Sequence, residues 1–359
     1  MIYDLCYTTR MNEAVLYRKY RPQSFKEVLG QEHIISILEA TARAGAPAHA
    51  YLFAGSRGTG KTSVARIFAR EIGCAAEDLY EMDGASNRNI EDVRELREAV
   101  RTLPFKSPFK VYIIDEVHML TTPAFNALLK TLEEPPKHVV FILATTDPEK
   151  LPDTILSRCQ IFKFGKPSHA LLGKMASAVA KKEGFALEPS ASELVALLGD
   201  GSFRDTHGVL QRVLGASGSE KKIAREFVER VTNAPSATRV NELISAIAER
   251  DLAKGLLVID RLAEADTNFT LFSKLLLEKI RLVLLLRFLP ETEKKAAEEL
   301  TPDELAQYKL FAKEKTKEIN SHTLLALIDA HTALGRAHLP QVPLELALMS
   351  LLAPVDKTP

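Results

Sequence analysis

The segment 55–62 constrains this chain more than any other part of its sequence. It reads Gly-Ser-Arg-Gly-Thr-Gly-Lys-Thr and matches the phosphate-binding pattern G-x-x-x-x-G-K-[ST], which follows a strand and opens a helix. Residues 50–54 are apolar and read as that strand, and residues 63–72 read as the helix. A plain glycine-rich turn is the alternative, and the strand–loop–helix context disfavours it. The predicted phosphate-binding residues are Gly55, Ser56, Arg57, Gly58, Thr59, Gly60, Lys61, Thr62 and Ser63.

Each residue type in this loop has a chemical task. Glycines let backbone N–H groups turn toward phosphate oxygens, while a lysine such as Lys61 reaches the β- and γ-phosphates. The hydroxyl of Thr62 can ligate magnesium, and the positive end of the following helix points at the same anion. The sequence therefore predicts a nucleotide site with a bound Mg²⁺.

Two carboxylates follow a second apolar run, 111–114. Asp115 and Glu116 stand at the carboxyl end of this predicted strand, where open α/β sheets bind ligands. Asp115 would hold Mg²⁺ through water, and Glu116 would orient the water that attacks the γ-phosphate. Two solvated carboxylates are the alternative. His118 completes an Asp-Glu-x-His string that some helicases carry, but nothing later in the chain supplies a second helicase-type domain.

Four more residues are candidates on position alone. Thr145 and Thr146 stand at the end of the next predicted strand, where a hydroxyl could be directed at the γ-phosphate or at the water, although threonine is also a common strand residue. Arg158 precedes the strand at 161 and could act on the transferring phosphate, in this chain or in a neighbour. Arg204 could close over the γ-phosphate, or could be an arginine that stabilises a helix start.

Composition limits the remaining possibilities. A chain of 359 residues is too long for one ordinary core, so two or three domains are expected. Basic and acidic residues balance at 47 each, so any nucleic-acid contact has to come from a local patch. The three cysteines, Cys6, Cys74 and Cys159, form no C-x-x-C pair, which argues against disulfides and cysteine zinc sites and favours a reducing cytoplasm.

No segment reads as a membrane span or a signal peptide. The most apolar stretch, 269–289, predicts a buried bundle helix because its charges are too costly for a bilayer. The start of the chain has no basic flank followed by a long apolar core, and Met11 is an alternative start to Met1. The charges within that stretch are Lys274, Glu278, Lys279, Arg281 and Arg287.

The order of elements predicts an α/β part followed by all-α parts. An extension, 1–14, precedes a parallel-sheet domain, 15–166, with strands expected at 50–54, 79–82, 111–114, 139–145 and 161–164. The runs 111–114 and 139–144 are apolar throughout and should be central strands. After residue 167 the strand signal disappears, which predicts a helical domain, 167–232, and a second helical domain, 236–355, after the break at 233–236.

These motifs resemble those of the AAA+ ATPases. The sequence between them resembles that of the bacterial DNA polymerase III gamma/tau family, the motor of the sliding-clamp loader. The resemblance covers most of residues 15–215. Six blocks carry it, at 16–22, 25–31, 83–87, 115–120, 125–136 and 144–159. It implies an AAA+ P-loop ATPase domain, a helical lid and a C-terminal helical collar that holds a ring-like pentamer together.

The resemblance also implies roles for individual residues. Thr146 would be the hydrolysis sensor, Arg158 a finger acting on an adjacent subunit, and Arg204 a lid sensor that couples ATP to the angle between lid and sheet. Lys130 and Arg88 would contact DNA, with an ordinary solvated helix charge as the alternative for both. The adenine pocket would be lined by Tyr17, Arg21, Pro22 and Leu29.

The implied function is an ATPase that opens a sliding clamp and places it on primed DNA. Its implied partners are clamp-loader subunits of the delta and delta-prime type, copies of itself, the clamp and primed-template DNA, with no membrane. Another AAA+ motor, of the branch-migration or recombination type, and a non-hydrolysing structural clamp-loader subunit are the alternatives. The block Phe125-Asn126-Ala127-Leu128-Leu129-Lys130 with its double proline disfavours the first, and the intact Lys61 and Glu116 disfavour the second.

The sequence departs from this family in two respects. The family carries a four-cysteine zinc module before the second strand, whereas here Cys74 is five residues from Leu79, so we predict no zinc. The chain also ends near the close of the predicted collar, without the extension of the longer tau form, and we expect a gamma-like length. Polymerase chemistry is not expected in this chain, because no carboxylate set is arranged for nucleotidyl transfer.

Overall fold

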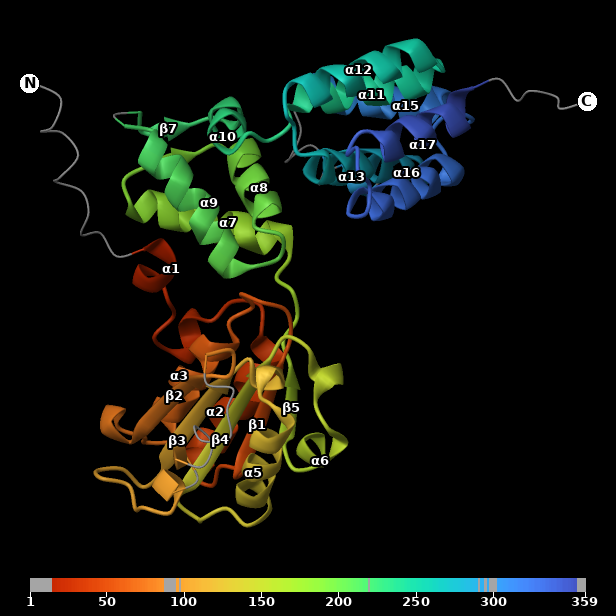
Figure 1. The fold of residues 1–359 in the computed structure, drawn as a ribbon. Helices are drawn as coiled ribbons and strands as arrows, with labels where there is room; N and C mark the ends of the chain where they lie inside the picture. The colour runs from red at the N-terminus through yellow and green to blue at the C-terminus, as the bar shows by residue number, and fades with distance from the viewer. Residues whose placement is uncertain are drawn as a thin grey trace, which may run out of the picture. The chain divides into compact units, whose positions relative to one another are not determined.

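The computed structural model describes residues 15–86, 95–96, 98–218, 220–289, 291–293, 296 and 302–353 (Figure 1). The chain forms two compact units. Unit 1 comprises residues 1–176 and 199–211, and unit 2 comprises 177–198 and 212–359. The domain boundaries expected from the sequence stay a prediction.

Unit 1 is built on a five-stranded parallel sheet. Its strands are β1 (Ala50–Ala54), β2 (Leu79–Asp83), β3 (Lys110–Asp115), β4 (Val139–Thr145) and β5 (Gln160–Lys163). They lie in the order β2-β3-β4-β1-β5, and each neighbouring pair is parallel. Every residue of β1 and β4 is buried. The parallel α/β sheet predicted from the sequence is confirmed, and β3 and β4 are internal strands as expected.

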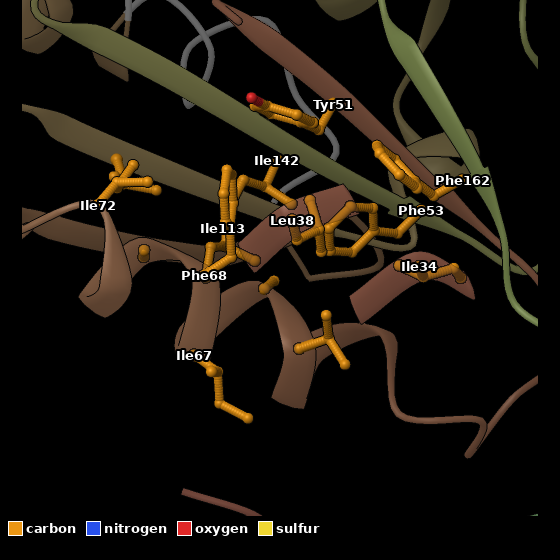
Figure 2. Packing of buried hydrophobic residues seen from close by; sticks show 14 of the residues in the cluster. Ile34, Leu38, Tyr51, Phe53, Ile67, Phe68, Ile72, Ile113, Ile142 and Phe162 are labelled. Atoms are coloured by element: carbon orange, nitrogen blue, oxygen red, sulfur yellow. The ribbon is translucent and has the colours of Figure 1, made fainter. Parts of the chain in front are cut away.

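Helices cover both faces of this sheet. On one face, alternate residues of the strands pack against α2 (Glu32–Ala44) and α3 (Lys61–Glu71). Figure 2 shows the middle of this cluster, with Phe68 of α3 close to Ile113 of β3 and Ile142 of β4. On the other face the intervening residues pack against α5 (Thr122–Glu133). Because successive strand residues point to opposite faces, uninterrupted apolar strands require both layers.

Unit 1 contains further helices and several short 3-10 turns. They are α1 (Leu16–Lys19), α6 (Asp153–Leu156), the first part of α7 (His169–Lys182) and the first part of α9 (Phe203–Ala216), with 3-10 turns at Phe25–Glu27, Ala76–Asp78, Val117–Met119 and Pro148–Lys150. Helix α9 is bonded to α1, because the N–H of Leu16 donates to Oε1 of Gln211 over 3.1 Å.

Unit 2 is mainly helical. It contains α8 (Pro189–Leu198), α10 (Arg225–Thr232), α11 (Ala237–Glu249), α12 (Leu252–Glu264), α13 (Phe269–Phe288), α15 (Pro302–Glu314), α16 (Ser321–Leu334) and α17 (Val342–Leu352). The expectation of no strand after residue 167 is wrong. Strands β6 (Ala186–Leu187) and β7 (Lys222–Ile223) form a parallel pair. Each strand has only two residues, so its sequence cannot show the alternation of apolar and polar residues that predicts a strand.

The apolar stretch predicted as a bundle helix is α13, which packs against α15 and α16. Arg287 of α13 donates to the carbonyls of Ala312 and Ile319, both over 2.9 Å. In the part of the chain that the structure describes, no helix is both long enough and apolar enough to cross a bilayer.

Candidate functional site

The candidate site lies where β1, β3 and β4 end. The loop 55–60 follows β1, Asp115 is the last residue of β3, and Thr145 is the last residue of β4. Ala54 pairs with Thr145 across β1 and β4, and the N–H of Gly55 donates to the Thr145 carbonyl over 3.1 Å. Since the carboxyl ends of parallel strands share one edge, segments far apart in the sequence meet here.

The loop after β1 surrounds a buried amine. Helix α3 begins at Lys61, two residues earlier than expected, and Gly60 before it has φ 102°, a region that favours glycine. Lys61 is 5% exposed, and its ammonium donates to the carbonyls of Gly55 over 2.7 Å and Ser56 over 3.0 Å. Burial lowers the pKa of Lys61, while Asp115 and Glu116 act in the opposite direction.

One polar atom of this loop has no partner in the protein. The Ser56 hydroxyl oxygen is buried without a hydrogen bond, and buried polar atoms normally have one. The first N–H groups of α3 also lack partners within their own helix, as at any helix start. An anion seated in the loop would satisfy both, so the residues present fit a bound phosphate.

Two oxygen ligands suited to Mg²⁺ stand beside this loop. The Thr62 hydroxyl donates to Oδ2 of Asp115 over 2.7 Å, which brings the first turn of α3 to the end of β3. Hydroxyl and carboxylate oxygens are the hard ligands that Mg²⁺ takes, usually with several waters retained. The donor set therefore fits a magnesium ion, which Thr62 and Asp115 would hold.

Glu116 has a strained backbone and a tightly held carboxylate. Its φ of 47° lies in the left-handed region, which costs a non-glycine residue free energy and is typical of functional sites. Oε2 accepts from the backbone N–H of Thr146 over 3.2 Å and from its hydroxyl over 2.8 Å. Nδ1 of His118 lies 3.4 Å from the same oxygen and 2.9 Å from the hydroxyl of Thr145. The sequence placed Glu116 and Thr146 at one site but did not predict that they bond to each other.

Arg204 lies close to the loop because α9 is hydrogen-bonded to it. The N–H of Phe203 donates to the Gly58 carbonyl over 2.9 Å. Gly58 has φ 74°, and a Cβ at this position would collide with the Ser202 hydroxyl. The Arg204 guanidinium carbon lies 5.4 Å from the centre of the Tyr17 ring. A close approach of two backbones thus brings Arg204 to the site, and only glycine allows it.

Several positively charged side chains lie close to one another at the site. Burial lowers the pKa of Arg21, and the charges of Arg66 and Arg204 lower it further, with Glu81 opposing. Arg204 also lowers the pKa of Lys61. Cations that repel one another in this way are stabilised by a bound polyanion. The charge distribution therefore suits a polyphosphate.

The remaining predicted residues are placed as follows. Pro22 is half-buried and Leu29 is exposed, both on the segment between α1 and α2. Arg158, on the turn between α6 and β5, donates to Oε1 of Glu133 and to the Thr154 carbonyl, both over 2.8 Å. Lys130 is exposed on α5, and Arg88 lies outside the described residues. The contacts described for Arg158 are therefore with α5 and α6 rather than with the loop.

Sequence reasoning missed His207. It lies one helical turn beyond Arg204, it is 7% exposed, and its ring is nearly parallel to that of Tyr20, at 12° with centroids 6.5 Å apart. The available signal was its spacing of three from Arg204, because residues i and i+3 lie on the same face of a helix.

The prediction that no zinc is bound stays a prediction. Within the described ranges, no cluster of three or more His, Cys, Asp or Glu side chains is placed to hold a metal ion.

The fold is that of the AAA+ ATPases. Similar solved structures include the Holliday junction branch migration motor RuvB of Thermotoga maritima, with a TM-score of 0.52 and 22% identity over 64% of this chain and 79% of that one. This likeness concerns the fold alone.

Curated relatives give the family. A DNA polymerase III subunit gamma of Buchnera aphidicola is 31% identical and covers 93% of this chain and 94% of itself. The subunit tau of Bacillus subtilis is 34% identical over 95% of this chain, and that of Escherichia coli 35% identical over 96%. A family model described as "DNA polymerase III, delta subunit" matches residues 30–89 and 77–168. The chain belongs to the DNA polymerase III gamma/tau family, and it spans 63% and 56% of the two tau relatives.

Proposed function

We propose that this chain is the ATP-hydrolysing motor subunit of a DNA polymerase III clamp loader. In this role it opens a ring-shaped sliding clamp and places it on primed DNA during replication. It would act in a pentamer with further copies of itself and with subunits of the delta and delta-prime type. The observation that carries the proposal is the convergence of Lys61, Thr62, Asp115, Glu116 and Thr146 at one sheet edge, in a chain of this family.

In the proposed hydrolysis the loop holds the triphosphate and Glu116 directs the water. The N–H groups of the loop and the Lys61 ammonium bind the β- and γ-phosphates, while Thr62 and Asp115 hold the metal. Bound Mg²⁺ supplies positive charge that stabilises the phosphates as the reaction proceeds. A water oxygen forms a bond to the γ-phosphorus as the bond from that phosphorus to the β–γ bridging oxygen breaks, which yields ADP and phosphate.

The hydrogen bonds of Glu116 suit this role. Oε2 of its carboxylate is occupied by the hydroxyl and the backbone N–H of Thr146. We propose that Oε1 accepts a hydrogen bond from the attacking water, with the strained backbone fixing its direction. Thr146 would then report on the γ-phosphate by exchanging its bond to Glu116 for one to phosphate.

Arg204 would couple nucleotide binding to movement of the helical lid. It stands on α9, whose first N–H bonds the phosphate loop at Gly58. A γ-phosphate that attracts Arg204 would therefore pull on a helix already attached to the site. The base would lie against the segment that carries Tyr17, Arg21, Pro22 and Leu29.

Arg158 is proposed to act on the nucleotide of an adjacent subunit. Its pairing with Glu133 in its own chain leaves the guanidinium partly exposed. A guanidinium supplied from a neighbour can stabilise the charge of phosphoryl transfer and couples turnover to assembly.

DNA would bind inside the assembled spiral through its phosphates. Lys130, exposed on α5, and Arg88 are the proposed contacts. Such binding should weaken with added salt and depend little on base sequence.

The test is ATP turnover by the purified chain with delta-type and delta-prime-type subunits, with and without clamp and primed-template DNA. We expect clamp and DNA together to stimulate turnover, and Arg158→Ala to remove the stimulation while each active site still binds ATP. Turnover indifferent to clamp and DNA would favour another AAA+ motor. ATP binding without any turnover would favour a structural subunit.

A further inference from the structure

His118 completes the Asp-Glu-x-His string and has no role in the proposed mechanism. It lies on the turn Val117–Met119, directly after Glu116, and its side chain is 9% exposed. Its Nδ1 lies 2.9 Å from the hydroxyl oxygen of Thr145 and 3.4 Å from Oε2 of Glu116. One imidazole nitrogen is therefore close both to the end of β4 and to the carboxylate that is proposed to direct the water.

The charge of Glu116 decides which form of the ring suits this place. Nδ1 bears a hydrogen in the imidazolium and in one neutral tautomer, and it bears a lone pair in the other tautomer. A lone pair there would be repelled by the negative Oε2, whereas an N–H is attracted to it. The hydrogen is therefore on Nδ1 and is donated to the Thr145 hydroxyl oxygen, which also accepts from the Asp147 N–H over 3.0 Å.

The Glu116 carboxylate is held by Thr146. Both hydrogen bonds that the structure describes for Oε2 come from this residue, one from its N–H over 3.2 Å and one from its hydroxyl over 2.8 Å. In the proposed mechanism the hydroxyl turns to the γ-phosphate, which leaves Oε2 with the longer bond alone. The last torsion of a glutamate side chain has no narrow minimum. A carboxylate with one long bond would therefore rotate and misdirect the water.

His118 is placed to replace the bond that Oε2 loses. An N–H bond to a carboxylate is about 2.8 Å long, so Nδ1 has to come about 0.6 Å closer to Oε2 than the present 3.4 Å. We propose that His118 is a positioning residue for hydrolysis. As Thr146 turns to the γ-phosphate, Nδ1–H of His118 donates to Oε2 of Glu116 and keeps Oε1 directed at the water. The inference rests on the proposed function, because that function assigns the attacking water to Glu116.

Two properties distinguish this role from a role in packing. A residue that acts through Glu116 affects the rate of hydrolysis and leaves the affinity for the nucleotide unchanged. The effect also depends on a donor at the position of Nδ1. An asparagine amide nitrogen is bonded to Cγ, as Nδ1 is, and can supply this donor, whereas the amide of glutamine lies one bond further from the backbone.

The experiment uses the chain assembled with delta-type and delta-prime-type subunits and Mg²⁺, without clamp or DNA. It measures kcat for ATP, the affinity for the slowly hydrolysed analogue ATPγS, and thermal melting. For His118→Phe we expect kcat to fall at least about tenfold, while the affinity for ATPγS stays within about twofold. His118→Asn should keep about half of kcat or more, and His118→Gln should resemble His118→Phe.

His138→Phe is the matched control. His138 directly precedes β4, at the end of the strand opposite to Thr145. Its Nε2 lies 3.3 Å from the carbonyl oxygen of Val100 and 3.2 Å from that of Thr102. Loss of these contacts should lower the melting temperature and leave kcat within about twofold. The control shows what the loss of a histidine from the same sheet does by itself.

The possible outcomes separate the inference from the proposed function. An unchanged kcat in His118→Phe, or an equal fall in kcat and affinity, would overturn the inference and leave the proposed function standing. The same holds if His118→Asn is no better than His118→Gln, a comparison that also serves if the phenylalanine variant does not fold. If the unchanged assembly bound ATPγS but did not hydrolyse ATP, or if Lys61→Ala kept full turnover, the proposed function itself would be wrong.

Discussion

Two basic residues, the buried Lys61 in unit 1 and the half-buried Arg287 in unit 2, bond to backbone carbonyls in different settings. Lys61 in unit 1 donates to Gly55 and Ser56 of a loop that also contains an unpartnered hydroxyl. Arg287 in unit 2 donates to Ala312 and Ile319, and so joins α13 to the end of α15 and to the segment before α16. Burial lowers the pKa of both. Lys61 is thus bonded to a loop that keeps an unpartnered hydroxyl, whereas the bonds of Arg287 connect parts of the protein.

The same contrast extends to other polar residues. In unit 2, side chains of Asp251, Asn268 and Asn320 accept from N–H groups at the starts of α12, α13 and α16. In unit 1, Gly60 stands at the start of α3 and provides no side chain to cap it. A capped helix start is satisfied within the protein, and an uncapped start beside a basic residue is available to a ligand.

Lys61→Ala is expected to have the largest effect, and it should change ATP turnover much more than stability. Removing the ammonium should lower ATP turnover by at least about 100-fold, because one positioned charge at a reacting phosphate contributes that much. The free energy of unfolding should change by less than about 1 kcal/mol, since the freed loop carbonyls can bond to water. Turnover and thermal melting of the same preparation check this. A variant that lost stability but kept turnover would reverse the assignment.

Arg287→Met should show the opposite pattern. It removes two hydrogen bonds from a charged donor while keeping the apolar stem, so we expect about 2 kcal/mol lower stability. Denaturant unfolding, followed by turnover per mole of folded protein, is the measurement. Because Arg287 lies outside the nucleotide site, a large fall in turnover of the folded protein would contradict the comparison.

Gly58→Ala tests whether α9 has to approach the phosphate loop closely. A Cβ there would meet Ser202 in addition to the strain of a positive φ, so ATP affinity should fall along with stability. Gly45→Ala is the matched control, since Gly45 has φ 62° with nothing within 4 Å of the added Cβ. We expect the control to cost about 1 kcal/mol of stability and no ATP affinity. Equal effects of the two changes on ATP binding would refute a role for the contact.

The smallest effect concerns two ion pairs. Arg158 and Glu133 are 33% and 49% exposed, whereas Arg225 and Glu229 of unit 2 are 15% and 13% exposed. Glu133→Gln should change stability by under about 0.5 kcal/mol, as is usual for exposed pairs. Glu229→Gln should cost about 1–2 kcal/mol, because the hydrogen bonds of this little-exposed carboxylate to Arg225 and to the Ala237 N–H lose their charge assistance. If chemical denaturation gave the same loss of stability for both substitutions, exposure would not be what determines the contribution of these ion pairs.

Much of the sheet and its loop could be predicted from the sequence because the signals are local. Strands β1 and β4 have the expected bounds, and the others differ by a residue at one or both ends. Apolar runs flanked by polar residues are sufficient for this. The pair β6–β7 was missed, because its two-residue strands are defined by pairing between segments far apart in the sequence.

Parts of the site depend on contacts that no spacing reveals. The bond between Glu116 and Thr146 joins residues 30 positions apart. The pairing of Arg158 with Glu133 also joins separate elements, α5 and the turn after α6. Such contacts require the strand order and the helix packing to be known.

By itself the sequence determined the phosphate loop, the carboxylate pair after β3 and the family, because these are consecutive residues whose chemistry does not depend on the rest of the chain. The tertiary structure decided the order β2-β3-β4-β1-β5 and brought Thr146 to Glu116. It also set α9 against α1, so that His207 is buried with an unpartnered Nε2. The physical reason is that burial and hydrogen-bond satisfaction depend on residues distant in the chain, and they are fixed only when the apolar faces have packed.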